Sequence, residues 1–214
     1  MVSKIIAKTA IGLTGTLYER VAKLGLKNLR SFGENCISGA TLERSAENLR
    51  KVRQAGVETI IDFRSEASSA FSRDCKDLGF KYLLFPLEHT RAGLSGVAKN
   101  GTSGLSDEFV LKLKDFITAT NESKVYMGCN YGIDRTNLGV VLNYLLNPKA
   151  INAPKILTWG DFRTKSVINK TLKTARKMIK KMTPEQRQMF GLGENYNDEF
   201  QKKIAKLLAV NLYH

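Results

Sequence analysis

Apolar residues follow two spacings along this chain. Short runs rich in β-branched and aromatic residues are typical of buried strands, and apolar residues at every third or fourth position are typical of helices. The runs predict strands over residues 57–64, 80–87 and 124–129, and an early edge strand that ends near residues 36–39. The helical spacing predicts helices over residues 41–54, 65–79, 107–120 and from Arg135 to about Leu146. Strands and helices that alternate in this way predict an α/β domain with a central, mostly parallel sheet flanked by helices.

Both ends of the chain are predicted to add helices to this domain. Apolar positions recur at helical spacing over residues 3–25, which indicates a packed helix, a disordered leader or an amphipathic helix on an acidic membrane. We therefore treat residues 1–28 as an N-terminal helical extension and residues 29–214 as the main domain. Its basic C-terminal part, about residues 163–214, is predicted to contain helices over residues 164–182, from Thr183 onward, and over residues 198–211.

The candidate chemistry lies where the strand at 124–129 meets the following helix. The first N–H groups of a helix have no partner within the helix and carry positive potential, so this turn is a natural anion site. Five residues separate Cys129 from Arg135, and their N–H groups can surround one phosphate-sized anion. The planar, two-pronged guanidinium of Arg135 can complete this ring of donors. Such surroundings favour the thiolate form of a cysteine, which is a nucleophile.

These residues resemble the Cys-x5-Arg-Ser/Thr signature of the cysteine-dependent phosphatases, the protein-tyrosine and dual-specificity superfamily. Cys129, Arg135 and Thr136 match the signature, and Gly132 stands at its usual glycine. Most members have histidine before the cysteine, whereas this chain has Gly128. The resemblance covers roughly residues 35–146 and implies a dual-specificity phosphatase-like fold.

The resemblance also implies the roles of the loop residues. Cys129 would attack phosphorus and form a phosphocysteine, and Thr136 would stabilise the thiolate when water releases the phosphate. The phosphate would be held by the loop residues Asn130, Tyr131, Gly132, Ile133, Asp134 and Arg135.

Two residues are candidates for the general acid. In the resembled family an acid, usually Asp, follows the strand that corresponds to residues 80–87, and Glu88 stands in that place. Asp134 lies within the loop, and Asp-Arg-Thr-Asn at 134–137 resembles the myotubularin and Sac-type phosphoinositide phosphatases, whose loop Asp is proposed to transfer a proton. An Asp at a helix start can also act as a cap, which is the structural alternative. His89 and Arg91 follow Glu88 in a Gly- and Ser-rich segment and are candidates for substrate contact.

Asp62 and Arg64 end the strand at 57–64 and resemble an Ile-Asp-Leu-Arg-type element of small bacterial dual-specificity phosphatases. The implied role is to brace the phosphate loop from below, and ordinary strand-end charges are the alternative. Cys75 falls within a predicted helix and is assigned no catalytic role.

The formal net charge of +14, from 34 basic and 20 acidic residues, indicates an acidic partner. A phosphorylated protein or a phosphoinositide fits this charge best as a substrate. The protein could also contact an acidic membrane peripherally, and nucleic acid is the less favoured partner. Three cysteines are too few for a disulfide framework and favour a reducing compartment, either the cytoplasm or a host cytosol after delivery. No apolar run is long enough to span a membrane, and no Cys/His cluster predicts a metal or other cofactor.

We predict a phosphomonoester hydrolase of the protein-tyrosine or dual-specificity type. A phosphoinositide phosphatase is the first alternative: the Asp-Arg-Thr-Asn likeness and the charge favour it, and the lack of lysine between Cys129 and Arg135 argues against it. A phosphate-binding module with weak turnover is the second alternative. A prediction of RNA 5′-triphosphate hydrolysis would rest on the net charge alone. The sequence does not indicate an oligomeric state.

Overall fold

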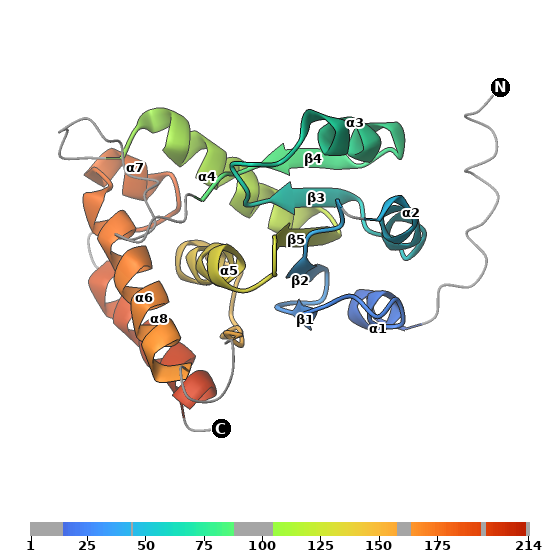
Figure 1. Cartoon of the computed structure of the whole chain (residues 1–214). Helices are drawn as coiled ribbons and strands as arrows, with labels where there is room; N and C mark the ends of the chain where they lie inside the picture. The colour runs from blue at the N-terminus through green and yellow to red at the C-terminus, as the bar shows by residue number, and fades with distance from the viewer. Residues whose placement is uncertain (1–14, 44, 88–104, 158–163, 194–195, 213–214) are drawn as a thin grey trace.

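The computed structural model describes residues 15–43, 45–87, 105–157, 164–193 and 196–212. Its strands form one sheet in the order β1-β2-β5-β3-β4 (Figure 1). The strands are β1 (Arg30–Ser31), β2 (Cys36–Ala40), β3 (Thr59–Asp62), β4 (Lys81–Leu84) and β5 (Val125–Cys129). β1 pairs antiparallel with β2, and every other pairing is parallel. The predicted mostly parallel α/β architecture is confirmed.

Helices cover both faces of this sheet (Figure 1). On one side lie α1 (Leu17–Ala22), α2 (Ala46–Gln54) and α3 (Ser69–Asp77). On the other lie α4 (Asp107–Glu122) and α5 (Asp134–Leu146), and beyond them α6 (Thr164–Lys181), α7 (Pro184–Gln188) and α8 (Tyr196–Leu212). Every residue of α5 from Arg135 to Leu146 is buried, so α5 is the central helix of the molecule.

Side chains alternate between two apolar clusters along the strands. In β5, Val125, Met127 and Cys129 join the cluster that includes α4, α5, α6 and α8. Tyr126 joins the cluster that includes α1, α2 and α3. Because both faces are covered, the strands appear in the sequence as nearly continuous apolar runs rather than as an alternation.

Side-chain caps fix several helix boundaries. Ser106 Oγ accepts from the backbone N–H of Phe109 at 3.3 Å and starts α4. Thr183 and Gln186 form a capping box around Pro184 at the start of α7. α5 ends at Leu146 as predicted.

Other boundaries were wrong. The helix predicted from residue 41 begins at Ala46, because Ser45 rather than Thr41 caps it and Thr41 Oγ1 accepts from Glu43 N–H in a preceding turn. The helix predicted over 65–79 is confined to 69–77, because Ser68 caps it. The strand ending near residue 39 is not an edge strand, since β1 pairs along its outer side.

The N-terminal helix is shorter than predicted in the part that the structure describes. It spans Leu17–Ala22, and Thr16 and Glu19 form a capping box that fixes its start. Leu17 and Val21 pack in the same cluster as residues of α2 and α3. Residues 1–14 lie outside the described part, so the division of the chain at residue 28 stays a prediction. Among the described helices, none combines the length and the apolar character needed to cross a bilayer.

Candidate active site

The loop between β5 and α5 lies at the carboxyl end of the sheet, where α/β folds place their ligands. β5 is flanked by the parallel strands β2 and β3, and the strand ends at Cys129. After four intervening residues, Asp134 begins α5. The predicted strand–loop–helix arrangement is therefore present, with Cys129 and Arg135 at the two ends of one short loop.

Cys129 is 4% exposed, and its sulfur accepts a hydrogen bond from the Thr136 hydroxyl. The Oγ1–Sγ distance is 3.1 Å, and Thr136 itself is fully buried. A hydroxyl that donates to sulfur stabilises the thiolate over the neutral thiol, because the interaction with the charged form is stronger. This contact joins two residues of the signature directly.

Close approach to β2 shapes the loop. Gly132 has φ +71°, and a Cβ at this position would overlap the backbone of Gly39. The Asn28 side-chain amide donates to the Tyr131 carbonyl at 2.7 Å on the same side. Only glycine satisfies both the positive φ and the close approach at position 132.

The close contact between β2 and β5 also explains why position 128 is glycine, where most members of the resembled family have histidine. Gly39 and Gly128 are register partners in β2 and β5, and a Cβ at Gly128 would lie 2.9 Å from the Gly39 carbonyl oxygen. A histidine in this position would therefore force the two strands apart.

Arg135 is buried and forms a two-pronged ion pair with Glu66. Its two terminal nitrogens donate to the two Glu66 carboxylate oxygens at 2.6 Å each, and the Asn130 amide donates to the same carboxylate at 2.8 Å. The bonds from Arg135 lower the pKa of Glu66 to about 2, and the Glu66 bonds raise that of Arg135. Sequence reasoning missed Glu66, whose sole sequence signal is its place just after the strand-end Asp-Phe-Arg.

Asp62 and Arg64 brace the end of β3, from which the segment with Glu66 departs. Arg64 Nε donates to Asp62 Oδ1 at 2.8 Å, and a further Arg64 nitrogen donates to Glu43. The Tyr82 hydroxyl adds a bond to Asp62 Oδ2 at 3.1 Å. Both members of the pair are nearly fully buried, so they are not ordinary solvent-exposed charges at a strand end, and the bracing of the phosphate loop stays a prediction.

A second buried arginine lies below the loop and was also missed. Arg30 Nε donates to Ser38 Oγ at 3.0 Å, and Arg30 Nη1 donates to Asn137 Oδ1 at 2.7 Å. Asn137 in turn bonds the backbone of Leu157 through both its amide nitrogen and its oxygen. The surrounding sequence has little pattern, so nothing in it marks Arg30 as part of a site.

The candidates for the general acid differ in how far the structure describes them. Asp134 is the first residue of α5, directly before Arg135, and the cap position belongs to Ile133. Asp134 lies in the first turn of α5, where the helix dipole favours a negative charge, so its role as an acid and its structural role both stay predictions. Glu88, His89 and Arg91 lie outside the described residues and stay predictions.

The other thiols differ from Cys129 in their surroundings. Cys36 and Cys75 are buried, and burial raises the pKa of each to about 12. Cys75 is fully buried on α3. Within the described ranges, no group of His, Cys, Asp and Glu side chains is arranged to hold a metal ion.

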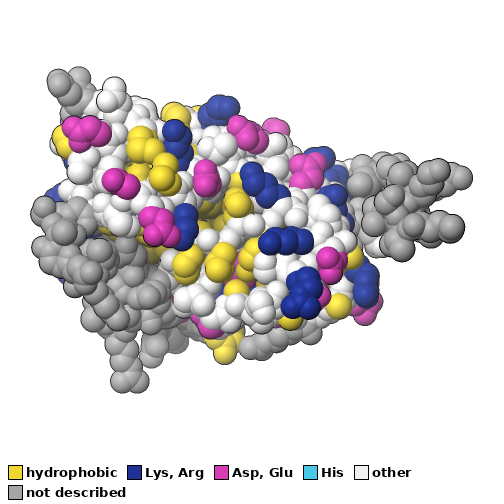
Figure 2. Space-filling view, turned by 90° about the horizontal axis from the view of Figure 1, so that it is seen from above, with side chains coloured by type: hydrophobic (Ala, Val, Ile, Leu, Met, Phe, Trp, Pro, Cys, Tyr) yellow, Lys and Arg dark blue, Asp and Glu magenta, His cyan; other side chains and the backbone are white. Residues whose placement is uncertain are grey.

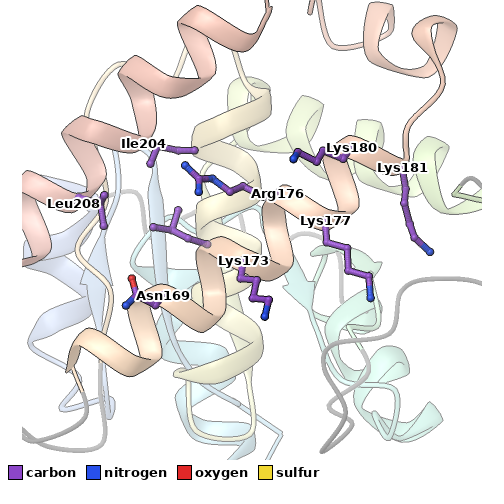
Figure 3. A pocket seen from close by; sticks show the side chains of 9 residues that line it. Asn169, Lys173, Arg176, Lys177, Lys180, Lys181, Ile204 and Leu208 are labelled. Carbon is purple, nitrogen blue, oxygen red and sulfur yellow. The ribbon is translucent and has the colours of Figure 1, made fainter.

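Two surface cavities could bind part of a ligand. One, of about 310 Å³, borders the loop and is lined by Lys27, Asn28, Asn48, Asn130 and Tyr131, among others. The other is a groove of about 610 Å³ between α6 and α8 (Figure 3). Its apolar part is formed by Leu172, Ile204 and Leu208, and its basic lining consists of Lys173, Arg176, Lys177, Lys180 and Lys181.

No protein-family model and no curated protein matches this chain. Among solved structures, a DUF442 phosphatase from Shewanella putrefaciens CN-32 is similar at 12% identity and a TM-score of 0.45, over 83% of this chain and 95% of that one. The core catalytic domain of the PP-IP phosphatase SIW14 from S. cerevisiae is similar at 15% identity and a TM-score of 0.44, over 84% and 92%. Tk-PTP in its active form gives 12% identity and a TM-score of 0.41, over 81% and 96%. These scores lie below 0.5, so the functional argument rests on the residues of the site alone.

Proposed function

We propose that this protein is a phosphomonoester hydrolase that acts through a phosphocysteine intermediate. The observation that carries the proposal is the bond from Thr136 to the Cys129 sulfur, in the loop between β5 and α5. In the resembled family this arrangement holds a thiolate under a bound phosphate. We favour substrates of the protein-tyrosine or dual-specificity type.

The reaction proceeds in two displacements. The Cys129 thiolate attacks phosphorus, the bond to the leaving oxygen breaks, and that oxygen takes a proton from Asp134 or Glu88. Water then attacks phosphorus and gives a proton to the same carboxylate, the S–P bond breaks, inorganic phosphate leaves, and the Thr136 hydroxyl stabilises the departing thiolate. The guanidinium of Arg135 binds the equatorial oxygens once the phosphate displaces Glu66 from it.

Turnover of a generic aryl phosphate by the full chain tests this proposal. Cys129→Ser is expected to abolish turnover, because a serine hydroxyl at this place is not ionised at neutral pH. Cys75→Ser is the matched control, since it removes a buried thiol outside the loop, and it should keep most of the activity of the folded protein. Turnover by the Cys129→Ser variant would contradict the mechanism, and no turnover by the unaltered protein would favour a phosphate-binding module.

A phosphoinositide substrate is the second candidate, and the basic groove of α6 favours it. α6 carries seven basic residues and no acidic one, and five of the seven line the groove. Such a face is complementary to the anionic surface of a membrane in which an inositol lipid would lie. Phosphate release from phosphotyrosine peptides, compared with release from phosphoinositides in vesicles, separates the two candidates.

A further inference from the structure

Arg30 carries a buried charge that needs an anionic partner. Its side chain comes from β1 and is 6% exposed. Both of its hydrogen-bond acceptors, Ser38 Oγ and Asn137 Oδ1, are neutral, and its Nη2 is buried without a hydrogen-bond partner. No carboxylate among the described residues bonds to it. A guanidinium buried in this way is strongly disfavoured unless a negative charge lies nearby.

Among the described residues, the Cys129 sulfur is the group whose negative charge can act on Arg30. Asn137, which Arg30 bonds, directly follows Thr136, which bonds the sulfur. Ser38, the other acceptor, lies two residues from Ala40, the register partner of Cys129 in β2. Arg30 and Cys129 therefore lie on one face of the sheet against the first turn of α5. Burial lowers the pKa of Arg30 to about 10, and the charge of an ionised Cys129 acts in the opposite direction.

Arg30 differs from Arg135 in whether another residue offsets its charge. The Glu66 carboxylate takes two hydrogen bonds from Arg135 and offsets the positive charge of that guanidinium. Gly128, directly before Cys129, has no side chain that could contribute a charge. Of these two arginines, Arg30 is therefore the one whose positive charge is not offset by a hydrogen-bonded carboxylate among the described residues.

We propose that Arg30 is a positioning residue that holds Cys129 in the thiolate form from below the loop. The thiol proton leaves to solvent, and the resulting thiolate and the Arg30 guanidinium stabilise each other as a buried pair of opposite charges. The catalytic consequence rests on the function proposed above, since a larger thiolate fraction matters only if Cys129 is the nucleophile. The ionisation of Cys129 itself does not depend on that function.

The test is the rate at which iodoacetamide alkylates Cys129 as a function of pH, with the alkylated residue identified by mass spectrometry. Arg30→Met removes the charge and keeps a long side chain, and Arg30→Lys keeps the charge. We expect the midpoint of the alkylation profile to rise by about one pH unit or more in Arg30→Met, so that the rate at neutral pH falls about tenfold. Arg30→Lys should restore most of the rate.

Arg53→Met is the matched control, because it also removes one positive charge from a half-buried arginine that bonds backbone carbonyls outside the loop. Its alkylation profile should equal that of the unaltered protein. An unchanged midpoint in a folded Arg30→Met variant would overturn the proposal. So would a shift of equal size in Arg53→Met.

A second measurement leaves Arg30 in place and covers the case in which Arg30→Met does not fold. The Arg30 Nε–H resonance of ¹⁵N-labelled protein should shift with pH at the same midpoint as alkylation, and this shift should vanish in Cys129→Ser. A resonance that does not follow the ionisation of Cys129 would overturn the proposal. Neither readout requires turnover, so a failure of the phosphatase assay and a failure of the role of Arg30 are distinguishable.

Discussion

At the scale of single residues, the Cys129 sulfur is surrounded by groups that favour a negative charge. Thr136 donates a hydrogen bond to it, and Arg30 and Arg135 lie within electrostatic reach. Glu66 opposes this arrangement, because its carboxylate takes the two N–H groups of Arg135 that a phosphate would use. A carboxylate and a phosphate oxygen compete for the same planar donor.

Removal of the Glu66 charge should therefore strengthen anion binding at the loop. In Glu66→Gln we expect the inhibition constant of orthovanadate to fall about tenfold, because a neutral amide competes less well than a carboxylate for a guanidinium. Bonding to Arg135 holds the pKa of Glu66 at about 2, below its ordinary value of 4.5. Since the carboxylate is protonated only as the pH falls toward 2, the effect should be constant from about pH 5 to 8.

Glu58→Gln is the control, because it removes one exposed carboxylate outside the loop. An inhibition constant that rises in Glu66→Gln would show instead that the carboxylate supports Arg135 and does not compete with the anion. A pH-dependent difference between pH 5 and 8 would contradict the low pKa.

The predictability of the site at this scale depends on separation along the chain. Cys129, Arg135 and Thr136 could be found from the sequence, because one short loop brings them together. Glu66 lies 69 residues from Arg135, and Arg30 lies 107 residues from Asn137. No local pattern encodes such pairs, because they meet only when β1 and the β3 end are placed in the sheet.

At the scale of elements, the contact between β2 and β5 controls the loop. The two strands are paired from Cys36 with Val125 to Ala40 with Cys129, and glycines face each other in this pairing. The chain thus has a structural reason for Gly128, where the resembled family has histidine. The sequence showed the departure, and the strand pairing explains it.

Gly128→His restores the pattern of the resembled family, and it should lower the free energy of unfolding of this protein. Its Cβ would lie 2.9 Å from the Gly39 carbonyl oxygen, and overpacking of this kind costs about 1–3 kcal/mol. The melting temperature of a chain of this size should fall by about 2–4 °C for each kcal/mol lost. Thermal unfolding followed by circular dichroism measures this change.

Gly193→His is the matched control, since nothing lies within 4 Å of a Cβ at that position. Its melting temperature should stay close to that of the unaltered protein. A Gly128→His variant of unchanged stability and higher activity would refute the explanation by strand packing.

At the scale of the whole molecule, the excess of positive charge is unevenly distributed. Figure 2 shows basic and acidic side chains interspersed on the face seen from above. α6 instead has basic side chains alone among its charged residues, and Lys173, Lys177 and Lys181 point away from α8 in Figure 3. An uneven distribution of this kind favours one orientation on an anionic surface.

We expect the triple variant Lys173→Glu, Lys177→Glu, Lys180→Glu to bind phosphatidylserine-containing vesicles at least about 100-fold more weakly, at about 1 kcal/mol per lysine near the surface. A control with Lys23, Lys81 and Lys114 changed to Glu has the same net charge and should lose much less binding. Co-sedimentation measures both, with phosphatidylcholine vesicles as the blank. Equal losses in the two variants would show that net charge alone, and not the α6 face, directs the contact.

The sequence by itself determined the types of most elements, the α/β class and the loop from Cys129 to Thr136. Its signals for these features are local: apolar spacing, helix caps and the succession of strand, turn and helix. The tertiary structure alone decided the strand order, the pairing of β1 outside β2, the position of Glu66 on Arg135 and the bond from Arg30 to Asn137. These features arise from contacts between distant segments, which form only when both faces of the sheet are buried together.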